Sequence, residues 1–513
     1  METQSPSPPL PSSLNTKDFL PSILILTPTI VYSLRNNDRF LAQAQGANRW
    51  ILENFGGLFT WSTFLFLVLL LVVYFSPLAK VRIGGAGAKP LLSKWRWFSI
   101  ALCTTIATGV LFWGTAEPLY HFHAPPQGLG IEATSSAAGQ FAISTLFMHW
   151  SFTPYGIYTI AGLVFALSYY NLRQPFSVSS LLYPLLGRWV HGSLGTAMDI
   201  ICLYGLVAGM AASLGTGVFA LMGGLETTLG VPQSNVLLGI IGLVVVLTFI
   251  ASAITGLNKG IRILSDLNAR AFFLLAIFMF LTGPTIYILQ LGGESLWDYG
   301  RHFLSRSTNI ASGINSDWQY DWTIFYFANW MAWAPIAALF LGRLSVGYTV
   351  RDFLHFNLLF PSLFVLIWMS IFGGAALELD QATSGALYQV LITEGEQKIM
   401  YEVLSELPLG QFASIFTLII IFISYVTAAD SNISAMSAIS SRGISPENPE
   451  APLWIKTVWG GLIGTIAWVM ITSAGIDGIR LLSILGGFPA LFIMIVVAGG
   501  LLRLLSQVDT LSD

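Results

Sequence analysis

Charged residues are scarce in this chain. Only 10% of its 513 residues are Asp, Glu, Lys or Arg, whereas an ordinary soluble domain carries about 25%. Hydrophobic residues make up 54% of the sequence, and the mean hydropathy is +0.71. These values exclude a soluble globular domain. Long apolar runs separated by short polar turns instead predict an all-α polytopic membrane protein, so the lipid bilayer is an expected partner.

Cysteine is nearly absent as well. Cys103 and Cys202 both lie inside apolar runs, so neither a disulfide framework nor a thiol-metal site is supported. The six histidines never give two ligands four residues apart on one helix, and His121 with His123 are too few to hold a metal. We expect no metal-ligating residues. The net charge of −3 and the lack of a large basic cluster argue against a nucleic acid partner.

Sequence signatures of enzymes are also missing. The chain has no phosphate-binding loop, no nucleophile elbow and no polar segment long enough for an ATP-binding domain. We therefore expect neither an enzyme nor a resident cofactor. The remaining functional class is a transporter that moves a small solute through the membrane and is driven by concentration gradients.

Twelve apolar segments are long enough to predict transmembrane helices. They lie near residues 19–34, 55–75, 97–115, 137–168, 196–225, 234–255, 267–290, 322–342, 354–374, 410–438, 453–473 and 480–505. With both termini in the cytoplasm, 16 of the 23 Lys and Arg residues are inside and 7 are outside, as the positive-inside rule favours. We expect a multi-pass protein of the cytoplasmic membrane. The segment LWDYGRHFLSRS after the seventh span predicts a short helix on the outer surface.

The two ends of the chain are polar. The first 17 residues are rich in Pro and Ser and predict a disordered cytoplasmic tail over residues 1–17. They lack the basic start and the cleavage site of a signal peptide, so we expect no cleavage. We expect the transporter domain to cover residues 18–505 and a short cytoplasmic tail to cover residues 506–513.

Aromatic residues gather in the middle of two spans. Trp150, Tyr155 and Tyr158 share one broad face of the fourth span, and the eighth span reads FANWMAWAP, with Trp330 and Trp333. A quaternary ammonium group has no N–H donor, but the faces of aromatic rings attract it by roughly 0.5–2 kcal/mol per ring. The two clusters together predict an aromatic box for an onium group. Packing of the rings between helices is the alternative that the spacing alone leaves open.

Prolines interrupt the spans near these clusters. Pro154 follows Trp150, Pro335 follows Trp333, and the segment ATGVLFWGTAEP ends at Pro118. Irregular backbone within the bilayer is tolerated where it lines a cavity or packed protein. Broken helices near the middle of the membrane therefore indicate a transporter's binding site.

Two acidic residues within spans are functional candidates, because inserting a charge into the bilayer is costly. Asp430 lies deep in the tenth span, and Glu117 lies near the end of the third. We interpret both as gating or structural contacts between helices, with proton carrying as the alternative.

Four motifs carry a resemblance to a known family. They read FWGTAEPLYHFHAPP, HWSFTPYGIY, FANWMAWAPIAALFLGRLSVGYTVRDF and VTAADSNISAMS. Over residues 18 to 505 the sequence resembles the betaine/choline/carnitine transporter (BCCT) family. The resemblance implies a LeuT-like fold of two inverted five-helix repeats, at about residues 93–290 and 320–505, after two extra N-terminal helices. It also implies a homotrimer.

The resemblance assigns roles to residues of the aromatic clusters. The box would consist of Trp150, Tyr155, Tyr158 and Trp330, with Trp333 just beyond it. Departures from the family pattern add further candidate substrate contacts. They are Phe327 and Asn329 in the eighth span, and Ile106 and Thr108, where betaine transporters have a glycine-rich run.

Sodium-coupled members of the family hold an ion between the third and tenth spans with hydroxyl groups of a Thr-Ser pair. Here the pair is Thr427 and Ala428, so one hydroxyl oxygen is missing; sodium prefers oxygen ligands. Ser424 and Thr105 are candidates to compensate. A coupling Na⁺ ion is therefore one expectation, with proton symport and exchange as alternatives.

These observations predict a secondary active transporter that works by alternating access. Its expected substrate is a trimethylammonium or related zwitterionic solute of the betaine, choline or carnitine type. The alternatives are the same fold carrying another zwitterion, such as an amino acid or a sulfonium compound, and a solute sensor that does not transport.

Overall fold

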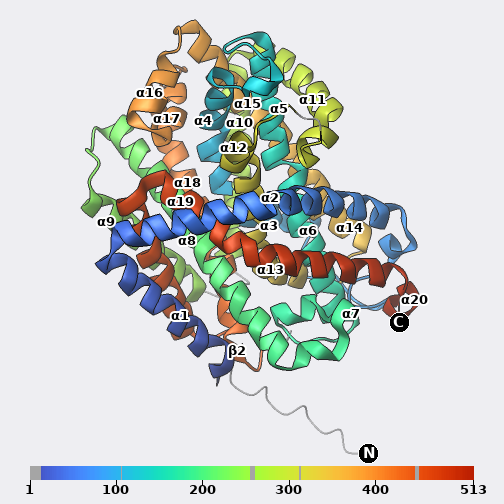
Figure 1. Ribbon diagram of the computed structural model, residues 1–513. Coiled ribbons are helices and arrows are strands. Elements are labelled where there is room, and N and C mark those ends of the chain that lie inside the picture. The colour runs from blue at the N-terminus through green and yellow to red at the C-terminus, as the bar shows by residue number, and fades with distance from the viewer. Residues whose placement is uncertain (1–12, 106, 255–259, 311–312, 445–449, 513) are drawn as a thin grey trace, which may run out of the picture.

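The computed structural model describes residues 13–105, 107–254, 260–310, 313–444 and 450–512 (Figure 1). The elements of the first half are β1 (Ser13–Leu14), α1 (Thr16–Arg35), α2 (Asn37–Phe75), η1 (Pro77–Lys80), α3 (Lys94–Thr105), α4 (Ala107–His123), η2 (Gln127–Leu129), α5 (Ser136–Trp150), α6 (Phe152–Ala166), η3 (Leu167–Asn171), η4 (Val178–Leu181), α7 (Tyr183–Leu186), η5 (Gly187–His191), α8 (Ser193–Leu229), α9 (Asn235–Ile254) and α10 (Gly260–Thr282).

Helices dominate the second half as well. Its elements are α11 (Thr285–Thr308), α12 (Ser316–Gln319), η6 (Tyr320–Ile324), α13 (Phe325–Arg343), α14 (Val350–Leu354), η7 (His355–Leu359), α15 (Phe360–Ala382), α16 (Ala386–Glu394), α17 (Glu396–Ser405), α18 (Gly410–Ile439), β2 (Ser441–Arg442), α19 (Leu453–Leu505) and α20 (Val508–Ser512). The expected all-α polytopic fold is confirmed.

The described residues contain ten helices that are long and apolar enough to cross a bilayer, or eleven when the bent pair α3 and α4 counts as one span. The expected first span is also helical, as α1, although α1 is not among these eleven. The last two expected spans form the single element α19, which kinks at Gly475. The φ of Gly475 is 55°, in the left-handed region that favours glycine.

The seventh span ends earlier than the sequence suggested. We expected it to reach residue 290, but α10 ends at Thr282 and a new helix, α11, begins at Thr285. Pro284 lies at the break. The helix ends there because proline lacks an N–H group and disfavours helical backbone at the residue before it. The expected surface helix LWDYGRHFLSRS forms the second half of α11.

The N-terminal segment is more ordered than expected over its described residues. Ser13–Leu14 pairs antiparallel with Ser441–Arg442, and the Asn15 amide donates to the carbonyl of Ser440 at 2.8 Å. The expected disordered tail is therefore too long at its C-terminal side, because backbone hydrogen bonds fix residues 13–17. At the other end α20 packs Leu511 into the protein, where it is buried.

Long helices surround the site described below. α13 packs against α6, α8 and α19, and α15 packs against α4. In Figure 1, β2, α7 and α20 lie at the lower end of the molecule, and α11, α16 and α17 lie at the upper end. The division into two inverted repeats stays an interpretation of the family resemblance.

Candidate functional site

The fourth span is broken at its centre. α5 ends at Trp150 and α6 begins at Phe152, and between them Ser151 has φ −101° and ψ −112°. Pro154 has no N–H group to donate to the carbonyl of the preceding turn. The break leaves the carbonyl of His149 available, and the indole Nε1 of Trp330 on α13 donates to it at 3.0 Å. The irregular backbone thus fixes a ring from a distant part of the chain.

Three of the predicted box residues meet in the core. The ring centroids of Trp150 and Trp330 are 5.0 Å apart, with an angle of 72° between the rings. The ring of Tyr158 lies 6.4 Å from that of Trp330. All three side chains are buried. Rings from α5, α6 and α13 therefore converge, as the aromatic box requires.

Tyr326 is a fourth ring at this place, and the sequence reasoning missed it. Its ring stacks on Trp330 at 6.0 Å with 16° between the planes, and it meets the edge of Trp150 at 5.0 Å. Tyr326 lies four residues before Trp330, so both share one face of α13. This spacing was the signal that could have identified it.

Tyr155 and Phe327 lie outside this group of rings. Both are buried, but among the described residues no aromatic contact joins either of them to Trp150 or Trp330. The predicted second ring of the box is therefore not brought to the other three. Ile106 lies outside the described residues, and so does the side chain of Thr108.

A small cavity of about 50 Å³ adjoins the rings. The predicted site residues that line it are Thr105, Trp150, Asn329, Trp330 and Trp333. This volume holds only a few water-sized spheres. Trp150 and Tyr158 meet Trp330 edge to face, and Tyr326 stacks on it. An onium group therefore enters between the rings only when they move apart.

Asn329 connects two helices. Its Oδ1 accepts a hydrogen bond from the hydroxyl of Ser483 on α19 at 2.9 Å. Asn329, which the sequence predicts as a candidate substrate contact, therefore also pairs α13 with α19. This bond uses one of the two lone pairs of the amide oxygen and leaves one for another donor.

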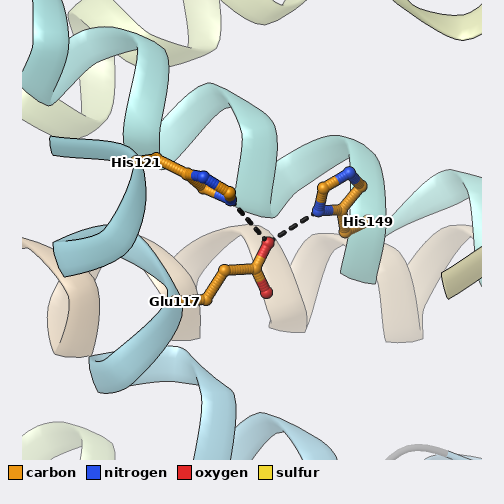
Figure 2. Close-up of side chains that lie close together, drawn as sticks. All are labelled: Glu117, His121 and His149. Atoms are coloured by element: carbon orange, nitrogen blue, oxygen red, sulfur yellow. Dashed lines mark hydrogen bonds and ion pairs between the residues drawn. The ribbon is translucent and has the colours of Figure 1, made fainter. Parts of the chain in front are cut away.

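A buried carboxylate accepts four hydrogen bonds beside the rings. Glu117 Oε1 accepts from His149 Nδ1 at 2.6 Å and from His121 Nε2 at 3.2 Å (Figure 2). Glu117 Oε2 accepts from Trp150 Nε1 at 2.7 Å and from the hydroxyl of Tyr326 at 2.6 Å. All five side chains are buried. Glu117 thus joins α4, α5 and α13 and orients two of the four rings.

The sequence predicted no metal-ligating residues, because no two histidines are four residues apart on one helix. The structure nevertheless brings together Glu117, His121 and His149. That prediction considered only pairs of histidines on one helix, whereas this cluster combines a Glu–His pair of α4 with a histidine of α5. The three facing atoms lie within 4.8 Å of one another. Since the His–Glu distances are those of hydrogen bonds, an ion between these atoms would have to break both contacts. We interpret the cluster as a hydrogen-bond network.

The three candidate ligands of a coupling sodium ion have other partners. The hydroxyl of Thr427 donates to the Ile423 carbonyl at 2.8 Å, and that of Thr105 donates to the Ala101 carbonyl at 3.0 Å. Ser424 Oγ accepts from Asn268 Nδ2 at 2.9 Å. Among the described residues, no hydrogen bond joins the three candidates to one another.

Asp430 also joins two helices. Its Oδ2 accepts from the hydroxyl of Ser252 on α9 at 2.6 Å. This bond agrees with the interpretation of Asp430 as a contact between helices. It connects α18 to α9.

A bundle of membrane-spanning helices with a buried cluster of rings at a broken helix defines the protein as a multi-pass membrane transporter. The family model described as "BCCT, betaine/carnitine/choline family transporter" matches residues 18–510. The chain belongs to this family.

Several curated relatives are similar over nearly the whole chain. The ectoine/hydroxyectoine transporter of Virgibacillus pantothenticus is 29% identical over 97% of this chain and 97% of its own length. The glycine betaine transporter OpuD of Bacillus subtilis is 30% identical, with 94% and 93% covered. The high-affinity choline transport protein of Escherichia coli is 30% identical, with 90% and 67% covered.

Among solved structures, a Na⁺-coupled sialic acid symporter in a substrate-bound outward-open state is a distant match. It aligns over 86% of each chain at 13% identity, with a TM-score of 0.47.

Proposed function

We propose that this transporter carries a small solute with a trimethylammonium or related onium group by alternating access. The rings of Trp150, Tyr158, Trp330 and Tyr326 hold the onium group through their faces. The observation that carries this proposal is the contact between Trp150 and Trp330, which come from two remote spans and lie 5.0 Å apart in the core.

Two further features support an onium group over a primary ammonium group. A primary ammonium needs several oxygen acceptors. Both oxygens of Glu117 already accept two donors each, and one of the two lone pairs of Asn329 Oδ1 already accepts from Ser483. The relatives are named for ectoine, glycine betaine and choline, which are small zwitterions or cations. Amino acids and sulfonium compounds are the alternative substrates, and a sensor that does not transport is the alternative function.

Uptake into proteoliposomes tests the proposal. Glycine betaine, choline, carnitine, ectoine and common amino acids compete for transport, and binding of each is measured on the purified protein. Trp330→Ala weakens onium binding by about 1–2 kcal/mol, the value of one ring face. Trp330→Phe retains much of the affinity because it keeps a ring.

Trp368→Phe is the matched control. Trp368 is as deeply buried as the box residues, but it stacks on Phe372 and donates to the Val110 carbonyl at 3.1 Å. Its replacement leaves onium affinity unchanged. Equal losses in Trp330→Ala and Trp330→Phe contradict recognition by a ring face, and binding without accumulation under any gradient supports the sensor.

We also propose that both termini lie in the cytoplasm. Under the charge assignment made from the sequence, Arg173 and Arg188 are inside and Arg301 and Lys398 are outside. α7, next to Arg188, lies at the lower end of Figure 1 with α20, whereas α11 and α17, which carry Arg301 and Lys398, lie at the upper end. The element next to Arg188 and the elements that carry Arg301 and Lys398 therefore lie at opposite ends of the molecule.

The coupling ion and the oligomeric state complete the proposal. Sodium coupling, with Thr427, Ser424 and Thr105 as candidate ligands, predicts uptake that follows a sodium gradient when the proton gradient is absent. The homotrimer implied by the family predicts three chains per particle in mild detergent, which mass measurement of the purified protein tests.

A further inference from the structure

We propose that His149 and Glu117 form a proton-binding site coupled to the ligand site, so that a proton on this pair and a cation among the rings disfavour each other. The coupling rests on the proposed function, but the proton site itself does not. Histidine is the side chain whose charge ordinarily changes between about pH 5 and 8.

The contacts of His149 accommodate either charge state without moving a side chain. Its Nδ1 lies 2.6 Å from Glu117 Oε1, and its Nε2 lies 3.0 Å from the hydroxyl of Thr323. In the neutral ring Nδ1–H donates to Glu117, while Nε2 accepts from the Thr323 hydroxyl. In the protonated ring both nitrogens donate, and the hydroxyl of Thr323 rotates to accept.

His121 lacks hydrogen-bond partners for both charge states. Its Nε2 faces Glu117, but its buried Nδ1 has no hydrogen-bond partner among the described residues. A proton added to Nδ1 would bury an unpaired N–H group of a charged ring, which is costly. The geometry therefore places the exchangeable proton on His149.

The proton site is connected directly to the rings. Glu117 Oε2 accepts from Trp150 Nε1 and from the Tyr326 hydroxyl, and the carbonyl of His149 accepts from Trp330 Nε1. With neutral histidines and an ionised Glu117, the cluster carries one negative charge. Protonation of His149 cancels this charge, so a cation at the rings loses a nearby attraction in a poorly screened core.

Other charged or titratable groups face the cluster from the surrounding elements. They are Glu117 and His121 of α4, Tyr326 of α13 and Arg480 of α19. Arg480 lies over the ring of Trp322 at 5.1 Å. His121 is the other group that ordinarily titrates near neutral pH, and it is tested by its own variant.

The first measurement follows the proton itself, without a ligand. NMR of the purified protein with ¹⁵N-labelled histidine, in a chelator, reports the charge of each ring between about pH 5 and 8.5. His149→Asn, whose amide can donate to Glu117 in place of Nδ1, assigns the signal. The expected result is that His149 gains a proton in this range. A His149 ring that keeps one charge throughout overturns the proposal.

The second measurement follows the coupling. Calorimetry of choline binding in buffers of different ionisation enthalpy gives the number of protons released on binding. We expect proton release and a choline affinity about tenfold weaker at the acidic end, with a smaller change for the zwitterion glycine betaine. His149→Asn abolishes the pH dependence, and the matched variant His121→Asn retains it.

The measurements distinguish a failure of the coupling from a failure of the proposed function. Choline that binds with no proton release and no pH dependence, or a dependence that persists in His149→Asn, overturns the coupling. If no onium ligand binds at any pH, the proposed function fails, while the NMR result still decides the proton site.

Discussion

Asn329 illustrates how one neighbour decides between two roles for a side chain. An amide in a substrate path can bind a ligand or join helices, and here its oxygen accepts from Ser483. We expect a double-mutant cycle of Asn329→Ala and Ser483→Ala to give a coupling of about 0.6 kcal/mol in detergent unfolding, the average for such bonds within membrane proteins. Additive effects of the two changes would contradict the pairing.

The residues that the sequence identified and those that it missed differ in a physical way. Trp150, Tyr158 and Trp330 stand out because large rings in the middle of apolar spans are conspicuous in a linear pattern. Tyr326 and Thr323 gain their importance only from what they contact on other helices. The spacing from Trp330 places Tyr326 on the same face of α13, but helix packing sets the contacts of both side chains with Glu117 and His149.

Two glycines of α4 each lie next to a buried tryptophan, one in the ring cluster and one outside it. A methyl group on Gly109 would overlap the six-membered ring of Trp150, whereas one on Gly114 would lie 3.3 Å from Trp368 Nε1. We expect Gly109→Ala to displace Trp150 and to lower onium affinity at least tenfold, the effect of about 1.4 kcal/mol. Gly114→Ala keeps the affinity within about twofold. Ligand binding to the purified variants checks both outcomes, and equal affinities would show that Trp150 does not need this close approach.

An ion pair within the surface helix α11 is hydrogen-bonded to a serine of the fourth span. Arg306 Nη1 donates to Asp298 Oδ2 at 2.6 Å, and both residues bond to Ser144 of α5. Burial raises the pKa of Asp298, but Arg306, Ser144 and His302 outweigh burial and hold this pKa below its ordinary value of 3.8. Because the folded-state pKa is depressed, the stabilisation is complete above pH 3.8 and is lost as the pH falls through the lower, folded value.

We therefore expect the melting temperature of the wild type to fall below about pH 4 more steeply than that of Asp298→Asn. At pH 7 the variant exchanges the amides of residues 285–308 with deuterium faster than the wild type. Arg301→Ala, an exposed change on the same helix, serves as the control. An unchanged exchange rate in Asp298→Asn would mean that the ion pair does not hold α11.

The sequence predicted the membrane-spanning helices, but it did not predict several of the residues at which they end. Apolar length located the spans, and the prolines indicated where the fourth span is irregular. The early end of α10 depends on Pro284, which the apolar run around it concealed. The strand pairing of Ser13–Leu14 joins segments from opposite ends of the chain, so no local pattern could predict it.

The orientation of the whole molecule can be measured with thiol reagents. Cys103 and Cys202 are both buried, so the native background should react slowly. Arg188 and Arg301 are exposed. We expect Arg301→Cys to react with an impermeant maleimide on intact cells and Arg188→Cys to react only after the membrane is opened. The reverse pattern would place the termini outside.

The short pairing of β1 with β2 has a mechanical consequence. Because β2 directly follows α18, backbone hydrogen bonds fasten the start of α1 to the end of α18. Any tilting of α18 during a transport cycle must therefore pull on α1, far from the aromatic rings. A fluorescent dye on α1 would then report the motion of the carrier without obstructing its cargo.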